Sequence, residues 1–127
     1  MGNVMNLRIH PKIFSICKLP AHEPVPDWLS RQNFSSITRT TDELSIVCEI
    51  NSVPSAVEKE SGWRLISVVE NLDFAMTGIL SSISTPLAEA KISIFVISTF
   101  DTDYFLIKQE NLQRAIAVLE NADFKFV

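Results

Sequence analysis

Two apolar runs near the C-terminus, residues 92–97 and 104–107, enclose a polar segment that contains Asp101 and Asp103. Strand-forming residues on both sides of a few turn formers are typical of a β-hairpin. Side chains two positions apart in an extended backbone point to the same side, so we expect these two carboxylates on one side of the hairpin tip. The pattern therefore predicts a hairpin with an acidic tip.

Around this hairpin, strand and helix periods alternate along the second half of the chain. Residues 63–69 predict a half-buried strand, and residues 124–127 predict a short edge strand. Apolar positions recur at helical spacing over 78–90 and 111–121, and Pro86 is expected to kink the first of these helices. The order β-α-β-β-α-β is that of the ferredoxin-like split βαβ arrangement, an antiparallel sheet with two helices on one face.

The first half repeats this order in a shorter form. Residues 13–19 predict a strand, and residues 24–31 predict a short helix. A hairpin is predicted from 34–39 and 44–50, and residues 7–9 fit one further strand. The first half is therefore interpreted as a degenerate copy of the second.

An ungapped alignment of the two predicted hairpins supports a duplication. With Ile37 on Ile97, Glu43 falls on Asp103, at a spacing of about 60 residues. Turn formers and a charged run over 51–62 predict a boundary. We therefore expect an α+β chain of two ferredoxin-like βαββαβ modules, residues 1–61 and 62–127. The two modules should pack together, because a domain of about 60 residues buries too little surface to be stable alone.

The composition argues against several classes of protein. A content of 46% hydrophobic and 20% charged residues is typical of a globular domain. Neither a secretory signal nor a membrane-spanning run is found, so we expect a cytoplasmic protein that does not bind membranes. The formal net charge of −4, without a basic cluster, argues against nucleic-acid binding. Cys17 and Cys48 lie in apolar runs, where we expect buried, reduced thiols.

The start of the predicted helix near Gly78 suits a carboxylate. Residues 73–78 pass from a strand into this helix, whose first backbone amides and dipole favour an anion. Gly78 has no side chain, so a ligand can approach the backbone closely. The alternative is a plain strand-to-helix turn that Thr77 or Asp73 caps.

The acidic hairpin tip suits the opposite charge. Asp101 and Asp103 can accept hydrogen bonds from an ammonium or guanidinium group, and Ser98 and Thr99 add hydroxyls. The alternative is a pair of solvated turn acids. A calcium site is not expected, because two carboxylates without a third nearby acid supply too few oxygen ligands.

No pattern of catalytic residues is found. His10 and His22 are far apart and lie near prolines, and the three glycines form neither a phosphate loop nor a nucleophile elbow. We therefore expect no enzymatic activity, no catalytic residue, no metal and no cofactor.

Several blocks of the sequence resemble the small free-standing tandem ACT-domain proteins, which are similar to the ACT modules of aspartate kinases and to the CASTOR arginine sensors. The blocks are residues 36–48, 62–64, 72–74, 77–80, 86–90 and 97–106. The resemblance implies a site for an amino acid or a similar small zwitterion at a junction of ACT modules. It implicates Thr77, Gly78, Ile79, Ser98, Thr99, Phe100, Asp101 and Asp103 as ligand-binding residues, with the tip 40–43 as a weaker candidate.

The resemblance also implies one departure and one function. Relatives usually have glycine where Lys91 stands, so we expect strain at Lys91 or a different turn. We expect a regulatory sensor that acts in trans or by self-association, as a homodimer. The alternative is a ligand-free structural or interaction module with an ACT fold.

Overall fold

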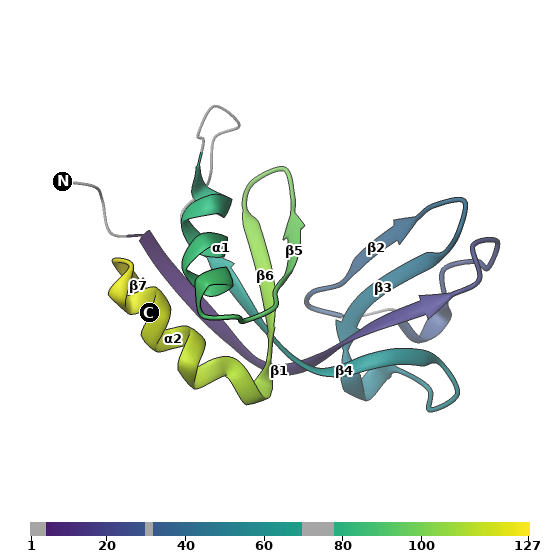
Figure 1. Cartoon of the computed structure of the whole chain (residues 1–127). Helices are drawn as coiled ribbons and strands as arrows, with labels where there is room; N and C mark the ends of the chain where they lie inside the picture. The colour runs from purple at the N-terminus through teal and green to yellow at the C-terminus, as the bar shows by residue number, and fades with distance from the viewer. Residues whose placement is uncertain (1–4, 30–31, 70–77) are drawn as a thin grey trace. The chain divides into compact units, whose positions relative to one another are not determined.

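The computed structural model describes residues 5–29, 32–69 and 78–127, which divide between two compact units (Figure 1). Unit 1 comprises residues 1–11 and 64–127, and unit 2 comprises residues 12–63. Two long strands, β1 (Met5–Leu19) and β4 (Glu58–Val68), contribute residues to both units. The expected modules, 1–61 and 62–127, remain a prediction.

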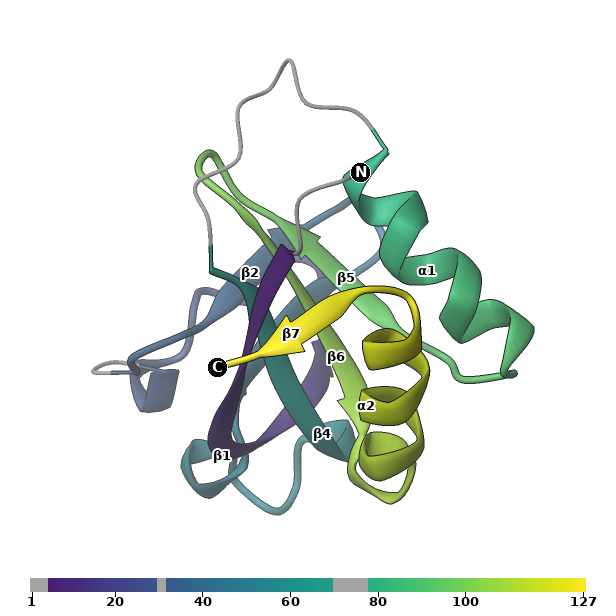
Figure 2. The same ribbon diagram turned by 90° about the vertical axis from the view of Figure 1, so that its left-hand side faces the viewer.

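Unit 1 has a sheet with mixed strand directions and two helices. The strands follow the order β1-β4-β6-β5, and β7 (Phe124–Phe126) pairs with β1 in parallel. β5 (Phe95–Ser98) and β6 (Asp103–Lys108) pair antiparallel. The helices α1 (Ile79–Glu89) and α2 (Leu112–Asn121) lie together on one side of this sheet (Figures 1 and 2). The fold of the chain is thus α+β, as predicted, but the predicted antiparallel sheet is wrong in one place, because β7 runs parallel to β1.

The core of unit 1 follows from the periodicity of these elements. Alternate residues of the strands and one stripe of each helix turn toward each other and exclude water. Helix α1 contributes Ile83 and Leu87, and α2 contributes Ala115 and Leu119, all 0% or 1% exposed. The remaining buried members are Leu7, Ile66, Val68, Ile92, Phe105, Ile107, Leu112 and Phe124.

Unit 2 has the strand order β2-β3-β1-β4, in which β2 (Ser36–Arg39) and β3 (Leu44–Glu49) form a hairpin. Its buried cluster consists of Cys17, Leu29, Leu44, Ile46 and Cys48.

The predicted helix over 24–31 is wrong in the described part of that range. Only the 3-10 turn η1 (Asp27–Leu29) forms, closed by a bond from the amide of Leu29 to the carbonyl of Pro26 at 3.2 Å. Pro24 and Pro26 disfavour the helical conformation at the residues that precede them.

Residues predicted as two separate strands form the single strand β1. Pro11 stands between residues 5–7, which pair with β7, and residues 14–19, which pair with β3. Its missing amide therefore removes no bond to either strand. The predicted linker was also too long, because β4 already begins at Glu58. The charged run fits a strand because Glu58 and Glu60 are exposed on alternate positions while Lys59 is half-buried.

The two hairpins match element by element at a spacing of 59 residues. Ser36 and Phe95 begin the first strand of each hairpin, and Leu44 and Asp103 begin the second. The 3-10 turns η2 (Ile50–Ser52) and η3 (Gln109–Asn111) follow at the same spacing. The sequence alignment, at about 60 residues, was therefore wrong by one position.

The end of α1 explains the departure at Lys91, whose φ of 60° is left-handed. The amide of Lys91 donates to the carbonyl of Ala88 at 2.9 Å, and the amide of Ile92 donates to the carbonyl of Leu87 at 2.9 Å. These two bonds make a Schellman motif, in which the left-handed residue is usually glycine. The expectation of strain at Lys91 is thus supported by its backbone geometry. Pro86 lies within α1, and the expected kink remains a prediction.

Candidate functional site

Helix α1 begins at a glycine that takes a left-handed conformation. Gly78 is the N-cap residue, with φ 79° and ψ 1°, and Ile79 is the first helical residue. The first helical hydrogen bond runs from the amide of Ser82 to the carbonyl of Gly78 at 2.9 Å. The amides of residues 79–81 precede that bond, so they are the donors that a helix start offers to an anion. Thr77, the third predicted residue here, lies outside the described residues.

The tip of the β5–β6 hairpin is a four-residue turn held by its own polar groups. The amide of Thr99 donates to the carbonyl of Thr102 at 2.8 Å, and the amide of Thr102 donates to the Thr99 hydroxyl at 3.3 Å. The Thr102 hydroxyl donates to the carbonyl of Val68 at 3.0 Å, which attaches the turn to the end of β4. These bonds fix the turn without using the carboxylates.

The two tip acids have different settings. Asp103 opens strand β6, and its Oδ1 accepts a hydrogen bond from the Ser98 hydroxyl at 2.6 Å. Asp101 is exposed and lies in the turn rather than in a strand, so strand alternation does not place its carboxylate, and a shared site with Asp103 stays a prediction. Phe100, beside it, is 79% exposed. A carboxylate accepts several hydrogen bonds, so Asp103 can hold a cation while Ser98 orients it.

The two features that the sequence singled out for a ligand, the start of α1 and the tip of the β5–β6 hairpin, both lie in unit 1. Helix α1 begins, and the β5–β6 hairpin turns, at the same end of this unit (Figures 1 and 2). Amide donors at one feature and carboxylates at the other give this end groups of opposite polarity.

The equivalent tip in unit 2 has the same turn with different chemistry. The amide of Thr40 donates to the carbonyl of Glu43 at 2.9 Å, and the amide of Glu43 donates to the Thr40 hydroxyl at 3.1 Å. Asp42 stands where Asp101 stands, but Leu44 replaces Asp103 at the start of the second strand. The first tip therefore lacks the carboxylate that its counterpart orients through Ser98.

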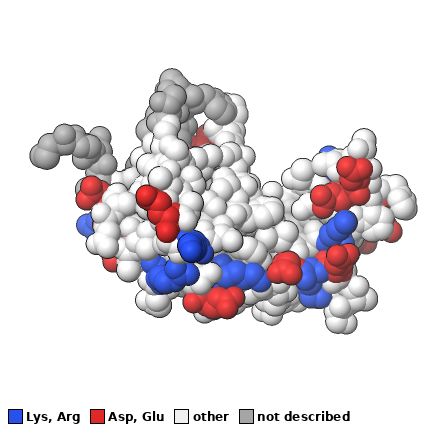
Figure 3. Space-filling model, viewed as in Figure 1, with Lys and Arg blue, Asp and Glu red and all other residues white. Residues whose placement is uncertain are grey.

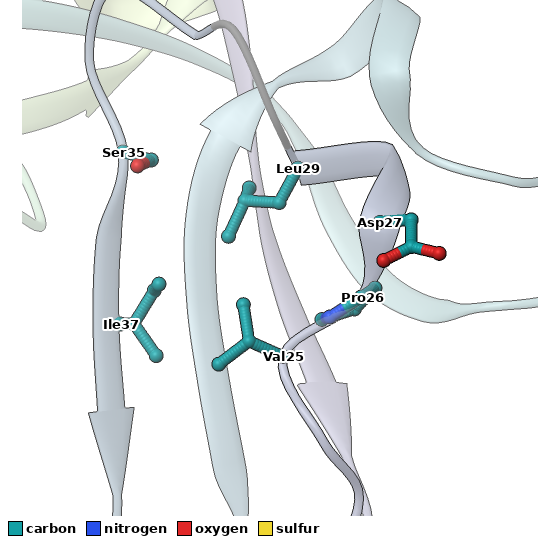
Figure 4. Close-up of a pocket in the computed structure, with 6 residues that line it drawn as sticks. All are labelled: Val25, Pro26, Asp27, Leu29, Ser35 and Ile37. Atoms are coloured by element: carbon teal, nitrogen blue, oxygen red, sulfur yellow. The ribbon is translucent and has the colours of Figure 1, made fainter.

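Unit 2 contains a pocket of about 480 Å³ that the sequence did not indicate. The side chains of Val25, Leu29 and Ile37 converge over β3, whereas Asp27 points away from them (Figure 4). Val25 and Ile37 are 46% and 45% exposed. An apolar residue between two prolines, Val25, was the one signal that could have drawn attention to this surface.

A second pocket of about 220 Å³ in unit 2 is lined by both signs of charge. Its lining residues are Ile16, Cys17, Lys18, Glu43, Ser45, Glu58, Lys59 and Glu60. The ammonium of Lys59 donates to the carbonyl oxygens of Val57 at 3.1 Å, Ser55 at 3.3 Å and Pro54 at 3.4 Å. These bonds hold Lys59 against the wall of the pocket.

The described part of the chain shows mixed charge on the face in Figure 3 and no cluster of metal ligands. On the face in Figure 3, Lys and Arg side chains are interspersed with Asp and Glu. Within residues 5–29, 32–69 and 78–127, no group of three or more His, Cys, Asp or Glu side chains is placed to hold a metal ion. None of the helices among these residues is long and apolar enough to cross a bilayer.

Comparison with known proteins identifies the family of unit 1. The ACT domain family model matches residues 58–121, about half of the chain, and the model of an N-terminal domain family matches residues 12–56. The human cytosolic arginine sensor for mTORC1 subunit 1 is 37% identical over 59 residues, 46% of this chain and 18% of the sensor. The chain spans between 18% and 59% of the length of the curated relatives that it matches.

Solved structures extend the match to nearly the whole chain. Protein Atu0741 from Agrobacterium tumefaciens is 37% identical, with a TM-score of 0.93 over 99% of this chain and 94% of that one. The regulatory subunit of aspartate kinase from Thermus thermophilus shares the fold alone, at 9% identity and a TM-score of 0.61, over 91% of this chain and 93% of that one. With its two helices on a mixed sheet and the family match across them, this chain belongs to the ACT domain family.

Proposed function

We propose that this chain is an amino-acid-binding regulatory protein that acts on a partner or through self-association. One observation carries the proposal: the start of α1 and the acidic tip of the β5–β6 hairpin lie at the same end of unit 1 (Figures 1 and 2). The amides after Gly78 suit the carboxylate of an amino acid, and Asp101 and Asp103 suit its ammonium group. Membership of a family that includes regulatory subunits supports this function over a catalytic one.

A ligand for such a site should bind with modest affinity. A sensor must release its ligand when the concentration falls, which corresponds to a Kd of about 1 μM to 1 mM. Arginine is a sensible first ligand to test, because a relative is named as an arginine sensor and two carboxylates suit a guanidinium group.

A thermal-shift panel of the twenty common amino acids tests the proposal. At about 100 times its Kd, a ligand that binds only the folded chain stabilises it by about 2.7 kcal/mol. Asp103→Asn should abolish most of this shift, because the amide retains an acceptor for Ser98 but removes the charge. Isothermal titration calorimetry then measures the loss of affinity directly.

Asp42→Asn is the matched control. It removes one carboxylate from the equivalent turn of the other hairpin, so it should leave the ligand-induced shift unchanged. Equal losses in Asp103→Asn and Asp42→Asn would contradict the proposed site. The absence of a shift with every amino acid would favour the alternative, a ligand-free interaction module with an ACT fold.

The duplication is the second part of the proposal. The two hairpins share a spacing of 59 residues, the same turn hydrogen bonds and the same following 3-10 turn, which supports two ACT-like modules over 1–61 and 62–127. In the first, η1 stands in place of the first helix, and residues 53–57 join η2 to β4 without a second helix. The first module is thus a reduced copy that contributes strands and turns.

Self-association is proposed as the route of output, in the cytoplasm and without catalysis. Among the described strands, β5 and the short β7 are outer strands of unit 1, and outer strands offer backbone groups for pairing with another chain. Light scattering with and without the amino acid that shifts the melting temperature measures the mass of the particle. A monomer under both conditions would contradict self-association. The chain would then regulate by acting on a separate partner.

A further inference from the structure

The two cysteines of the chain, 31 positions apart in the sequence (Cys17 and Cys48), meet in the core of unit 2. Cys17 pairs with Ile46 across β1 and β3, and Cys48 pairs with Ser15. The two cysteines are therefore diagonal neighbours on the same face of adjacent antiparallel strands. Both are free thiols, with exposed fractions of 1% and 0%. The sequence indicated two separate buried thiols and gave no sign of their proximity.

The environment makes the two sulfurs unequal. A hydrogen bond from the Cys48 thiol and then the positive charge of Lys59 outweigh burial and lower the pKa of Cys17. The same hydrogen bond, burial and the nearby charges of Cys17 and Glu49 raise the pKa of Cys48. Cys17 is thus the more acidic thiol of the pair, because Cys48 donates the shared hydrogen bond and Lys59 is nearby.

Cys17 borders one of the two pockets of unit 2, although its residue is only 1% exposed. Cys17 lines the 220 Å³ pocket together with Lys18 and Lys59. A pocket of this size admits a molecule as small as a peroxide to strand β1 beside Cys17. The Cys17 side chain itself lies on the buried face with Ile46, so the peroxide reaches the sulfur when the strand pair opens locally.

We propose that Cys17 and Cys48 are a redox modification site, at which a peroxide converts the two thiols into a reversible disulfide between β1 and β3. In the first step, the Cys17 thiolate attacks one peroxide oxygen, the O–O bond breaks, and the leaving hydroxide takes up a proton as water. In the second step, Cys48 loses its proton and attacks the Cys17 sulfenic acid. The S–S bond forms and a second water leaves, so two electrons in total pass from the sulfurs to the peroxide.

The strand geometry favours reversal of this bond. Diagonal neighbours on antiparallel strands have Cα atoms about 7–8 Å apart, whereas disulfides usually span about 4.4–6.8 Å. Closing the bond therefore shifts the backbone of β1 against β3, and such strained disulfides are reduced easily. A transient bond of this kind suits a reducing compartment, where stable disulfides are rare.

Intact mass spectrometry of the folded full chain treated with hydrogen peroxide tests the proposal. The expected product is a monomer lighter by about 2 Da, because two hydrogen atoms are lost, with both thiols blocked to alkylation in denaturant. Peptide mapping should find Cys17 joined to Cys48, and dithiothreitol should restore both thiols. Loss of both thiols only after unfolding, or a bond between two chains, would overturn the proposal.

Two single variants assign the roles of the sulfurs. In Cys48→Ala, Cys17 should stop at the sulfenic acid and be trapped as a dimedone adduct; in Cys17→Ala, Cys48 should remain a thiol. Alanine keeps the core apolar, and circular dichroism checks that each variant is folded. Oxidation of Cys48 in Cys17→Ala at the wild-type rate would contradict the assignment. The wild-type mass measurement stands independently if either variant does not fold.

Discussion

Lys91 carries a conformation that most side chains disfavour. Its φ of 60° places it at the left-handed position of the Schellman motif that ends α1. A residue with a Cβ costs about 1–2 kcal/mol in this region. A glycine avoids this cost but loses part of the gain, because it has more conformational entropy in the unfolded chain. The chain tolerates the cost because Ile92 and Leu87, which the motif brings together, both lie in the core.

Lys91→Gly should therefore raise the free energy of unfolding by about 0.5–1 kcal/mol. Urea denaturation measures it as a higher midpoint with an unchanged slope. Lys91→Ala is the control, since it removes the charge but keeps the Cβ, and it should give no such gain. A destabilised Lys91→Gly would show that the Lys91 side chain contributes more than its backbone costs.

His10 links stability to pH. Its Nε2 lies 3.1 Å from the Ser67 hydroxyl, and Arg64 donates to its carbonyl from Nη2 at 3.0 Å. Partial burial, and then the charge of Arg8, lower the pKa of His10. The unfolded chain therefore takes up a proton at a higher pH than the folded chain. The contribution of His10 to stability is present above its unfolded pKa of about 6.5 and is lost as the pH falls through the folded pKa.

Between about pH 7.5 and pH 5.5, the melting temperature of the wild type should fall more than that of His10→Asn, which cannot titrate. Differential scanning fluorimetry in a buffer series measures both slopes. His22→Asn, at an exposed position, should keep the wild-type slope. Parallel slopes for wild type and His10→Asn would show that another group governs this pH range.

At the scale of elements, periodicity in the sequence located both helices and the strands of the second half to within a few residues. The apolar stripes of α1 and α2 and the apolar runs of β5 and β6 can be recognised from neighbouring residues alone. These elements form as predicted because they bury their apolar residues in one core. The prediction of a short helix over 24–31 failed because Pro26 disfavours the helical conformation at Val25, a restriction that the apolar pattern does not reveal.

Pairing between distant strands was beyond the reach of local patterns. Residues 5–7 carry no pattern that predicts a parallel partner in β7. Residues 13–19 carry none that predicts Cys48 as a neighbour of Cys17. The candidate site followed the same division. Its turn residues could be read from the sequence, whereas the hydrogen bond from Ser98 to Asp103 and the exposure of Asp101 depend on the turn geometry.

At the scale of the whole molecule, the strand β1 limits how far the chain can be divided. Leu7 lies in the core of unit 1, and residues 5–7 pair with β7, although residues 12–19 belong to unit 2. The C-terminal half is thus missing a core residue and a partner strand when residues 1–11 are removed.

A fragment of residues 62–127 should therefore not fold stably on its own, despite matching most of an ACT domain. Heteronuclear NMR would show poorly dispersed amide signals. Adding a synthetic peptide of residues 1–19 should restore dispersion, and the same peptide with Leu7→Asp should not, because a buried charge at a fully buried position is costly. A well-dispersed spectrum for the fragment alone would show that β7 needs no partner strand.

A strand that serves two cores also constrains the length of the chain. Side chains alternate along β1, so adding or deleting one residue between Leu7 and Cys17 would turn every later side chain to the opposite face relative to the earlier ones. One unit would then present its polar face to its own interior. Insertions and deletions should accordingly be tolerated in the turn over 53–57, whereas in β1 they should destabilise the fold.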